Sequence, residues 1–241
     1  MHLDRDAVQR MARFGGLLYL IIIVIGVLGE AVIRNGLVVP HDAAATAANI
    51  LGAKLLWRVG VAAQMFLLLC AVGLTFVFYV LLRPVSRKLA AVVVGFALVS
   101  LAVESVGALS LSNVLTPLLA AKYLNVDPAL LHAQAYLAIL EHGNAFGIAL
   151  MFFGVEILFV GHLIRKASYL PSWVGVLMQL GGACYLVNSF ARVLFPALAG
   201  MLFPAILMPA FIAESAFCLW LLFKGVNVAE WERQAVRSAG T

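Results

Sequence analysis

Six long apolar stretches constrain this chain more than any other feature of its sequence. They cover approximately residues 14–34, 55–82, 88–112, 143–164, 171–195 and 203–223. A helix that crosses the hydrocarbon core of a bilayer needs about 20 apolar residues, and each stretch reaches that length. Because the backbone must satisfy its own hydrogen bonds in lipid, we predict an all-α bundle of six transmembrane helices. We expect it to form one membrane-embedded domain over residues 1–241.

The composition agrees with lipid as the natural solvent of the chain. Hydrophobic residues make up 64% of the sequence and charged residues 11%, whereas a soluble domain carries about 25% charged residues. The net charge is +5, but the basic residues stand in small groups between apolar runs. We therefore expect the lipid bilayer, and no nucleic acid, as a partner. The oligomeric state is left open.

The basic residues also predict an orientation. Five lie on one side of the alternating topology, at Arg34, Lys54, Arg58, Lys122 and Arg192. The other 11 of the 16 lie on the opposite side, at Arg5, Arg10, Arg13, Arg83, Arg87, Lys88, Arg165, Lys166, Lys224, Arg233 and Arg237. Because Lys and Arg accumulate in cytoplasmic loops, we predict that both termini are cytoplasmic.

Both longer outer connections carry signals for helix starts. Asp42 precedes an alanine-rich run, 43–53, and its carboxylate is a suitable N-cap. Asp127 precedes Pro128, which suits the first position of a helix. We therefore predict short helices in these two connections.

Polar and charged residues at membrane depth are the candidates for function, because each costs about 2.5–3.5 kcal/mol on insertion scales. Helix rise places most of them in the outer half of the bilayer; Glu30 and Glu104, for example, each lie about 24 Å from the inner face. The candidates are Glu30, Arg58, Glu104, Glu141, His142, Asn188, Arg192 and Glu214. They predict a polar chamber that faces outward. Alternatively, Arg58 and Arg192 form ion pairs with the glutamates and only hold the helices together.

A metal site is a weaker interpretation of the same residues. Glu104, Glu141 and His142 offer oxygen and nitrogen ligands. However, Glu141 and His142 are adjacent, so they point about 100° apart on a helix. The chain has no HExxH motif, and its three cysteines show no CxxC spacing. We predict no metal site, and the sequence identifies no cofactor.

Several strings resemble the membrane protein family catalogued as domain of unknown function 4386. They include GGLLYLIIIVIGVLGEAVIR, VVPHDAAATAANILGAKLLWRVGVAAQ, YVLLRPVSRKLA and ESAFCLWLLFKGVN, together with residues 152–190. The resemblance implies a multi-pass protein of the bacterial inner membrane, and it implies no activity. Glu30, Arg58, Asn188 and Glu214 lie inside the resembling strings. Glu104, Glu141 and His142 lie between them.

Three functions remain open at this point. We favour a bundle whose polar chamber binds a small or amphipathic ligand, as a transporter, sensor or carrier. The first alternative is an intramembrane enzyme that uses Glu and His for acid–base or metal chemistry on a lipid. The second is a structural or accessory membrane subunit. An enzyme is the less favoured class.

Overall fold

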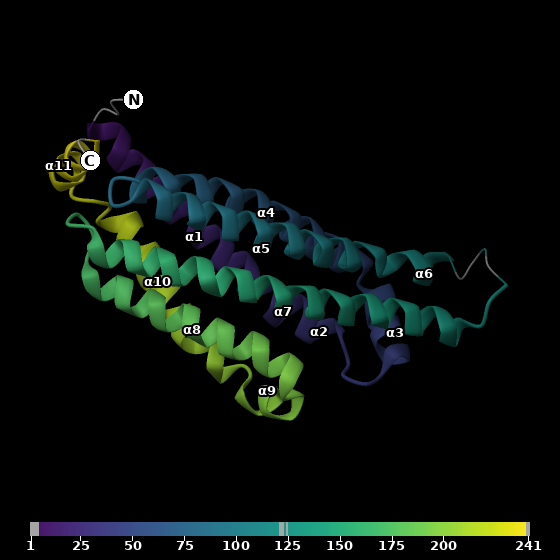
Figure 1. Ribbon diagram of the computed structural model, residues 1–241. Helices are drawn as coiled ribbons and strands as arrows, with labels where there is room; N and C mark the ends of the chain where they lie inside the picture. Colours follow the sequence, from purple (N-terminus) through teal and green to yellow (C-terminus); the bar gives the residue numbers. More distant parts are fainter. Residues whose placement is uncertain (1–4, 121–122, 124, 240–241) are drawn as a thin grey trace. The chain divides into compact units, whose positions relative to one another are not determined.

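The computed structural model describes residues 5–120, 123 and 125–239, and every regular element in this part of the chain is helical (Figure 1). Six helices are long and apolar enough to cross a membrane. They span Arg5–Leu37, Lys54–Leu82, Arg87–Ala120, Pro128–Lys166, Ser172–Leu194 and Ala205–Phe223. The predicted all-α class and its six spans are therefore confirmed. Lys122, one of the residues used to predict orientation, lies outside the described residues.

Shorter elements connect or extend these helices. The order is α1 (Arg5–Leu28), the π-helix η1 (Gly29–Arg34), α2 (Asn35–Leu37), α3 (Ala43–Gly52), α4 (Lys54–Leu82), α5 (Arg87–Asn113), α6 (Leu115–Ala120), α7 (Pro128–Lys166), α8 (Ser172–Leu194), α9 (Pro196–Leu202), the 3-10 helix η2 (Ala205–Leu207), α10 (Met208–Phe223) and α11 (Val228–Ala239).

Both predicted helix starts exist, but they begin different kinds of helix. The Asp42 carboxylate accepts a hydrogen bond of 2.8 Å from the Ala45 N–H, so the short helix α3 begins as predicted. Asp127 accepts one of 2.9 Å from the Ala129 N–H. The helix that follows is the 39-residue α7, so Asp127 begins a long helix; the short helix predicted in this connection is α6, which ends before Asp127. At about 1.5 Å per residue, α7 is nearly twice as long as a bilayer core of about 30 Å is thick.

The chain divides into two compact units. Unit 1 comprises residues 1–21, 70–101 and 147–241, and unit 2 comprises residues 22–69 and 102–146. Four helices, α1, α4, α5 and α7, contribute residues to both units. The single domain therefore stays a prediction.

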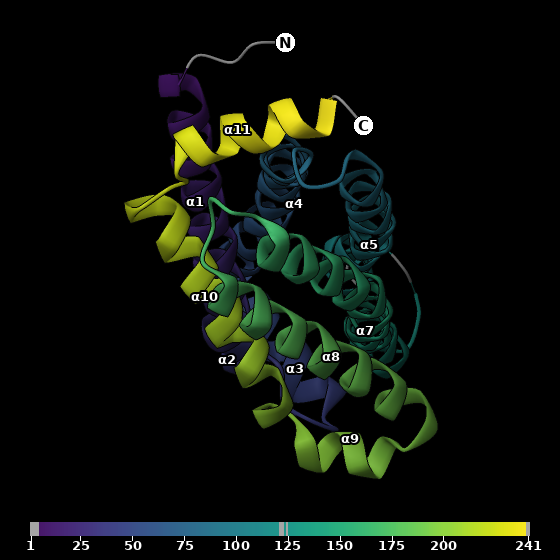
Figure 2. The same ribbon diagram turned by 60° about the vertical axis from the view of Figure 1, so that its left-hand side comes forward.

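Glycines bring three helices of unit 1 into backbone contact, side by side in Figure 2. A Cβ atom at Gly175 of α8 would lie 2.6 Å from the Gly161 carbonyl oxygen of α7. A Cβ at Gly182 would lie 2.7 Å from the Gly154 carbonyl oxygen. On another face of α8, a Cβ at Gly181 would lie 2.8 Å from a Cα atom of α10. Small residues thus allow α8 to pack closely against both neighbours, as is common between membrane helices.

One end of unit 1 is closed by side chains that bind free backbone groups. The Leu81 carbonyl oxygen, in the last turn of α4, accepts hydrogen bonds from the Tyr169 hydroxyl (2.6 Å) and the Trp231 indole (3.0 Å). Burial raises the pKa of Tyr169 above its ordinary value. Gln9 donates to the Lys224 carbonyl, 2.9 Å away. These bonds hold α11 across the ends of its neighbours (Figure 2).

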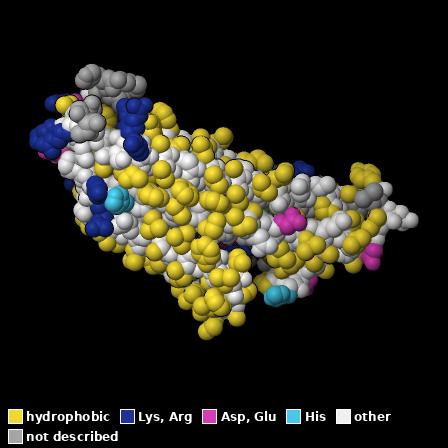
Figure 3. Space-filling model, in the orientation of Figure 1, with side chains coloured by type: hydrophobic (Ala, Val, Ile, Leu, Met, Phe, Trp, Pro, Cys, Tyr) yellow, Lys and Arg dark blue, Asp and Glu magenta, His cyan; other side chains and the backbone are white. Residues whose placement is uncertain are grey.

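Basic side chains gather at this same end of unit 1, close to α11 (Figure 3). The beginning of α1, the turn between α4 and α5, the turn between α7 and α8 and the end of α10 all meet there. The fold therefore brings together segments that we predicted, from their basic residues, to lie on one side of the membrane.

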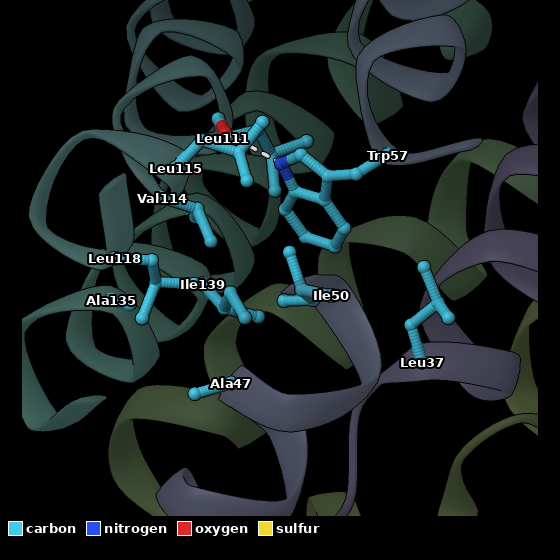
Figure 4. Close-up of a cluster of buried hydrophobic side chains, with 10 residues drawn as sticks. All are labelled: Leu37, Ala47, Ile50, Trp57, Leu111, Val114, Leu115, Leu118, Ala135 and Ile139. Atoms are coloured by element: carbon cyan, nitrogen blue, oxygen red, sulfur yellow. Dashed lines mark hydrogen bonds between the residues drawn. The ribbon is translucent and has the colours of Figure 1, made fainter. Parts of the chain in front are cut away.

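Unit 2 has its own apolar core, which the chain builds around Trp57 (Figure 4). The indole N–H of Trp57 on α4 donates a 3.2 Å hydrogen bond to the Leu111 carbonyl oxygen of α5. The side chains packed around it are Leu37, Ala47, Ile50, Leu111, Val114, Leu115, Leu118, Ala135 and Ile139. This core fixes α3, α4, α5, α6 and α7 against one another.

Candidate functional site

The π-helix η1 carries the first pair of functional side chains. Arg34 donates to the Glu30 carboxylate within this six-residue element. Single turns of π-helix are rare, and they are often found at functional sites. The Arg34 side chain is 21% exposed and that of Glu30 49%. The pair is therefore accessible in part, rather than sealed in the core.

A second polar contact links α4 and α5. The buried Gln64 amide donates a 2.8 Å hydrogen bond to the Glu104 carboxylate, which is half-buried. Arg34 also acts on Glu104 electrostatically. Glu104 thus has a neutral hydrogen-bond donor beside it and a cation within electrostatic range, both from other helices of unit 2.

The third contribution comes from His142 on α7, which is 5% exposed. Its ring stacks on Phe146, with centroids 6.3 Å apart. Its Nδ1 atom faces Gly107, where an added Cβ would lie 3.0 Å away, and interacts with the Gly107 backbone without a hydrogen bond of good geometry. Arg34 and Glu30 both act on the imidazole electrostatically. A buried ring nitrogen without a well-formed hydrogen bond is a costly arrangement.

These contacts define what we call the unit 2 polar group. Its members come from η1, α4, α5 and α7, and they combine both signs of charge with an amide and an imidazole. They are Glu30, Arg34, Gln64, Glu104 and His142.

The structure brings together three of the predicted site residues of unit 2, namely Glu30, Glu104 and His142. Arg58 and Glu141 are both exposed. Within the described residues, no ion pair involves either of them. The cation that pairs with Glu30 is Arg34, which the sequence placed at the end of a span and not in the site.

The other three predicted residues belong to unit 1. Glu214 is buried on α10 and accepts a hydrogen bond from the Tyr185 hydroxyl of α8. Asn188 is 2% exposed, and its side-chain oxygen has no hydrogen-bond partner. Arg192 is exposed on α8, and its guanidinium lies beside Gly147 of α7. Tyr185 was missed because a tyrosine in an apolar stretch gives no signal of a hydrogen bond to a carboxylate.

The geometry offers no ready metal site in the described part of the chain. No group of three or more His, Cys, Asp or Glu side chains there could hold a metal ion. Glu104, Glu141 and His142, the weak candidates from the sequence, are not brought together as a set of ligands.

Comparison with known proteins places this fold in a family. The family model described as "Domain of unknown function (DUF4386)" matches residues 14–225. A relative from Archaeoglobus fulgidus, named "Uncharacterized protein", is 26% identical over 152 residues, which cover 63% of this chain and 75% of the relative. No solved structure matches the chain. The match includes all six candidate spans in whole or in part, and the chain belongs to the family of domain of unknown function 4386.

Proposed function

We propose that this protein binds a small or amphipathic ligand through the unit 2 polar group, as a transporter, sensor or carrier. The observation that carries the proposal is the gathering of five polar side chains from four elements in one unit of a chain with six apolar helices. Ionisable residues at membrane depth are expensive, and they usually serve a substrate path or a binding site.

The chemistry of the group suits a ligand with a polar head. The Arg34 guanidinium is a fixed cation with several donors, which suits a phosphate or a carboxylate. The Glu104 carboxylate accepts hydrogen bonds. The Nδ1 atom of His142 can donate or accept a hydrogen bond, depending on the tautomer, when a ligand is bound. Large apolar side chains are exposed on the same elements, with Val32 at 52% and Leu109 at 59%. They could contact an acyl or aromatic part of the same molecule.

The distribution of basic residues and the apolar helices support a location of the protein and an orientation of its binding site in the membrane. The family resemblance and the six apolar helices support a multi-pass protein of the bacterial inner membrane. The basic end of unit 1 suits the cytoplasmic side. Helix rise from the start of each span supports a position of Glu30 and Glu104 in the outer half of the bilayer. We therefore propose that the ligand enters from the outer side of the membrane.

Native mass spectrometry of the protein purified in mild detergent tests the proposal. We expect a bound small molecule on the unaltered chain and at least a tenfold loss of it in Arg34→Ala and Gln64→Ala. Arg34 is the proposed cation for the ligand and Gln64 orients Glu104, and a hydrogen bond to a charged group contributes about 1.5–3 kcal/mol. Arg58→Ala is the matched control, because Arg58 is exposed and outside the polar group. It should retain the molecule.

Two results would contradict the proposal. One is an unaltered protein that carries no small molecule after extraction from its native membrane. The other is equal retention by the Arg34→Ala, Gln64→Ala and Arg58→Ala proteins. If the first two variants melt at lower temperature while they bind as the unaltered protein does, the polar group only holds the helices together.

A further inference from the structure

A second polar cluster lies inside unit 1, where four helices each contribute one side chain. Tyr19 comes from α1, Glu156 from α7, Tyr185 from α8 and Glu214 from α10. Tyr19 is 2% exposed, Glu156 4% and Glu214 8%, so both carboxyl groups are buried at membrane depth. We call these four residues the carboxyl quartet.

Contacts within the quartet centre on Glu214. The Tyr185 hydroxyl donates to one of its oxygen atoms. Tyr19 acts on Glu214 and on Glu156 electrostatically, and Glu156 acts on Glu214. The Tyr19 ring lies edge-on to Phe78 and Phe217, with centroids 5.9 Å and 6.4 Å away. Burial of Glu156 and Glu214 shields both carboxyl groups from solvent.

In the described part of the chain, no basic side chain acts on these two carboxyl groups. Among the residues that the structure describes, the groups that act on the quartet are its own members and Cys184 of α8. The unit 2 polar group differs, because Arg34 lies within electrostatic range of its carboxyl groups. Two carboxylates in a low-dielectric interior cost several kcal/mol each unless a positive charge neutralises them.

The Tyr19 hydroxyl group lies near the two carboxyl groups of the quartet. This hydroxyl is fully buried and interacts with Glu214, but without a hydrogen bond of good geometry. Buried hydroxyl groups normally find partners, because an unmade bond costs about 1–3 kcal/mol. A bound cation beside the carboxyl groups would be coordinated by the Tyr19 oxygen atom, whose O–H could then donate to a carboxylate.

We propose that the carboxyl quartet is a binding site for one exchangeable monovalent cation, a sodium ion or a proton. Hard monovalent cations prefer oxygen ligands, and the quartet supplies two carboxyl groups and two hydroxyl groups. Glu156 and Glu214 provide the negative charge, and Tyr19 and Tyr185 provide neutral oxygen atoms. The site is separate from the unit 2 polar group, so it does not rest on the proposed ligand. An ion held there would be suited to drive or to regulate movement of the surrounding helices.

Two arms of one experiment on the full-length protein in detergent distinguish the two cations. In the sodium arm, sodium chloride replaces choline chloride at constant ionic strength, and the melting temperature is recorded. In the proton arm, infrared difference spectra between about pH 6 and about pH 9 follow the C=O stretch of protonated carboxyl groups, because an unperturbed carboxyl group titrates well below this range. We expect a sodium-dependent rise in melting temperature or a reversible carboxyl band, and we expect loss of that response in Glu156→Gln and Glu214→Gln.

Two further variants make the result decisive. Glu141→Gln removes an exposed carboxyl group from the same helix as Glu156 and should leave the response intact. Tyr19→Phe removes only the buried hydroxyl, and it should shift the midpoint of the response about tenfold, equivalent to about 1.4 kcal/mol. A protein that responds in neither arm overturns the proposal, and so does a response that persists in both carboxyl variants. If those variants do not fold, an unchanged midpoint in Tyr19→Phe overturns it instead.

Discussion

Single residues complete the helix ends at the basic end of unit 1. The last four carbonyl groups of a helix have no partner within it, and side chains or turns must supply one. Tyr169 and Trp231 both serve the Leu81 carbonyl of α4. Gln9 bonds on either side of Gly225, to the Lys224 carbonyl and the Val226 N–H. Gly225 has φ of +69°, a conformation that glycine adopts without strain.

The Trp231→Phe substitution tests this closure of α4. It removes the indole donor and keeps an aromatic ring in the buried site, so we expect a loss of about 1 kcal/mol in unfolding free energy. Thermal unfolding in detergent measures the change. Trp173→Phe is the control, because Trp173 is 51% exposed. This variant should have the melting temperature of the unaltered protein. Equal melting temperatures for the two variants would show that the Leu81 bond contributes nothing.

At the scale of elements, backbone contact between α7 and α8 depends on glycines that repeat every seven residues. Gly154 and Gly161 on α7 face Gly182 and Gly175 on α8. Such pairs let two backbones approach closely enough for weak C–H···O contacts and extensive van der Waals packing. The glycines therefore position Glu156 and Tyr185, since each lies two or three residues from one of them.

The Gly182→Ala substitution tests this packing. The new Cβ would lie 2.7 Å from the Gly154 carbonyl oxygen, so the two backbones must separate. We expect a loss of about 1–3 kcal/mol in unfolding free energy, as for other overpacked cores, read from the melting temperature.

Gly95→Ala in α5 is the matched control, because a Cβ there meets nothing within 4 Å. Alanine favours helix over glycine by about 1 kcal/mol, so this variant should be as stable as the unaltered protein or more so. Equal destabilisation by both substitutions would contradict close packing of α7 on α8.

Local signals explain which elements the sequence could predict. Apolar length is a property of each segment alone, so all six spans were found, and Asp42 predicted the start of α3. The same reasoning predicted a helix start at Asp127 and Pro128 but missed that this helix continues into the fourth span. His132, Gln134 and Glu141 interrupt the apolar pattern of residues 128–142, although the helix runs through them. Packing on the Trp57 core, which includes Ala135 and Ile139, stabilises that part of the helix.

The candidate sites were predicted only in part, for a related reason. Helix rise gives the depth of a residue, and depth was enough to group Glu30 with Glu104. The direction in which a side chain points depends on helix rotation and packing, which one sequence does not give. Arg34, Gln64 and Tyr185 were therefore assigned no role, although each contacts a carboxyl group of the predicted set.

On the scale of the whole molecule, the proposed function depends on the orientation of the protein in the membrane. The basic segments of unit 1 meet at one end, near both described chain ends. If that end is cytoplasmic, the alternating topology of six spans predicts that Val126 is reached from the outer side. The proposed ligand site depends on this orientation.

Labelling of single cysteines in spheroplasts tests the orientation most directly. Cys70, Cys184 and Cys218 are first replaced, and a cysteine is then introduced as Val126→Cys or Val236→Cys. Both positions are exposed, at 40% before α7 and 72% on α11. We predict that a membrane-impermeant maleimide labels Val126→Cys in intact spheroplasts and labels Val236→Cys only after the membrane is opened. Labelling of Val236→Cys in intact spheroplasts, with Val126→Cys protected, would contradict the orientation and the outward-facing site.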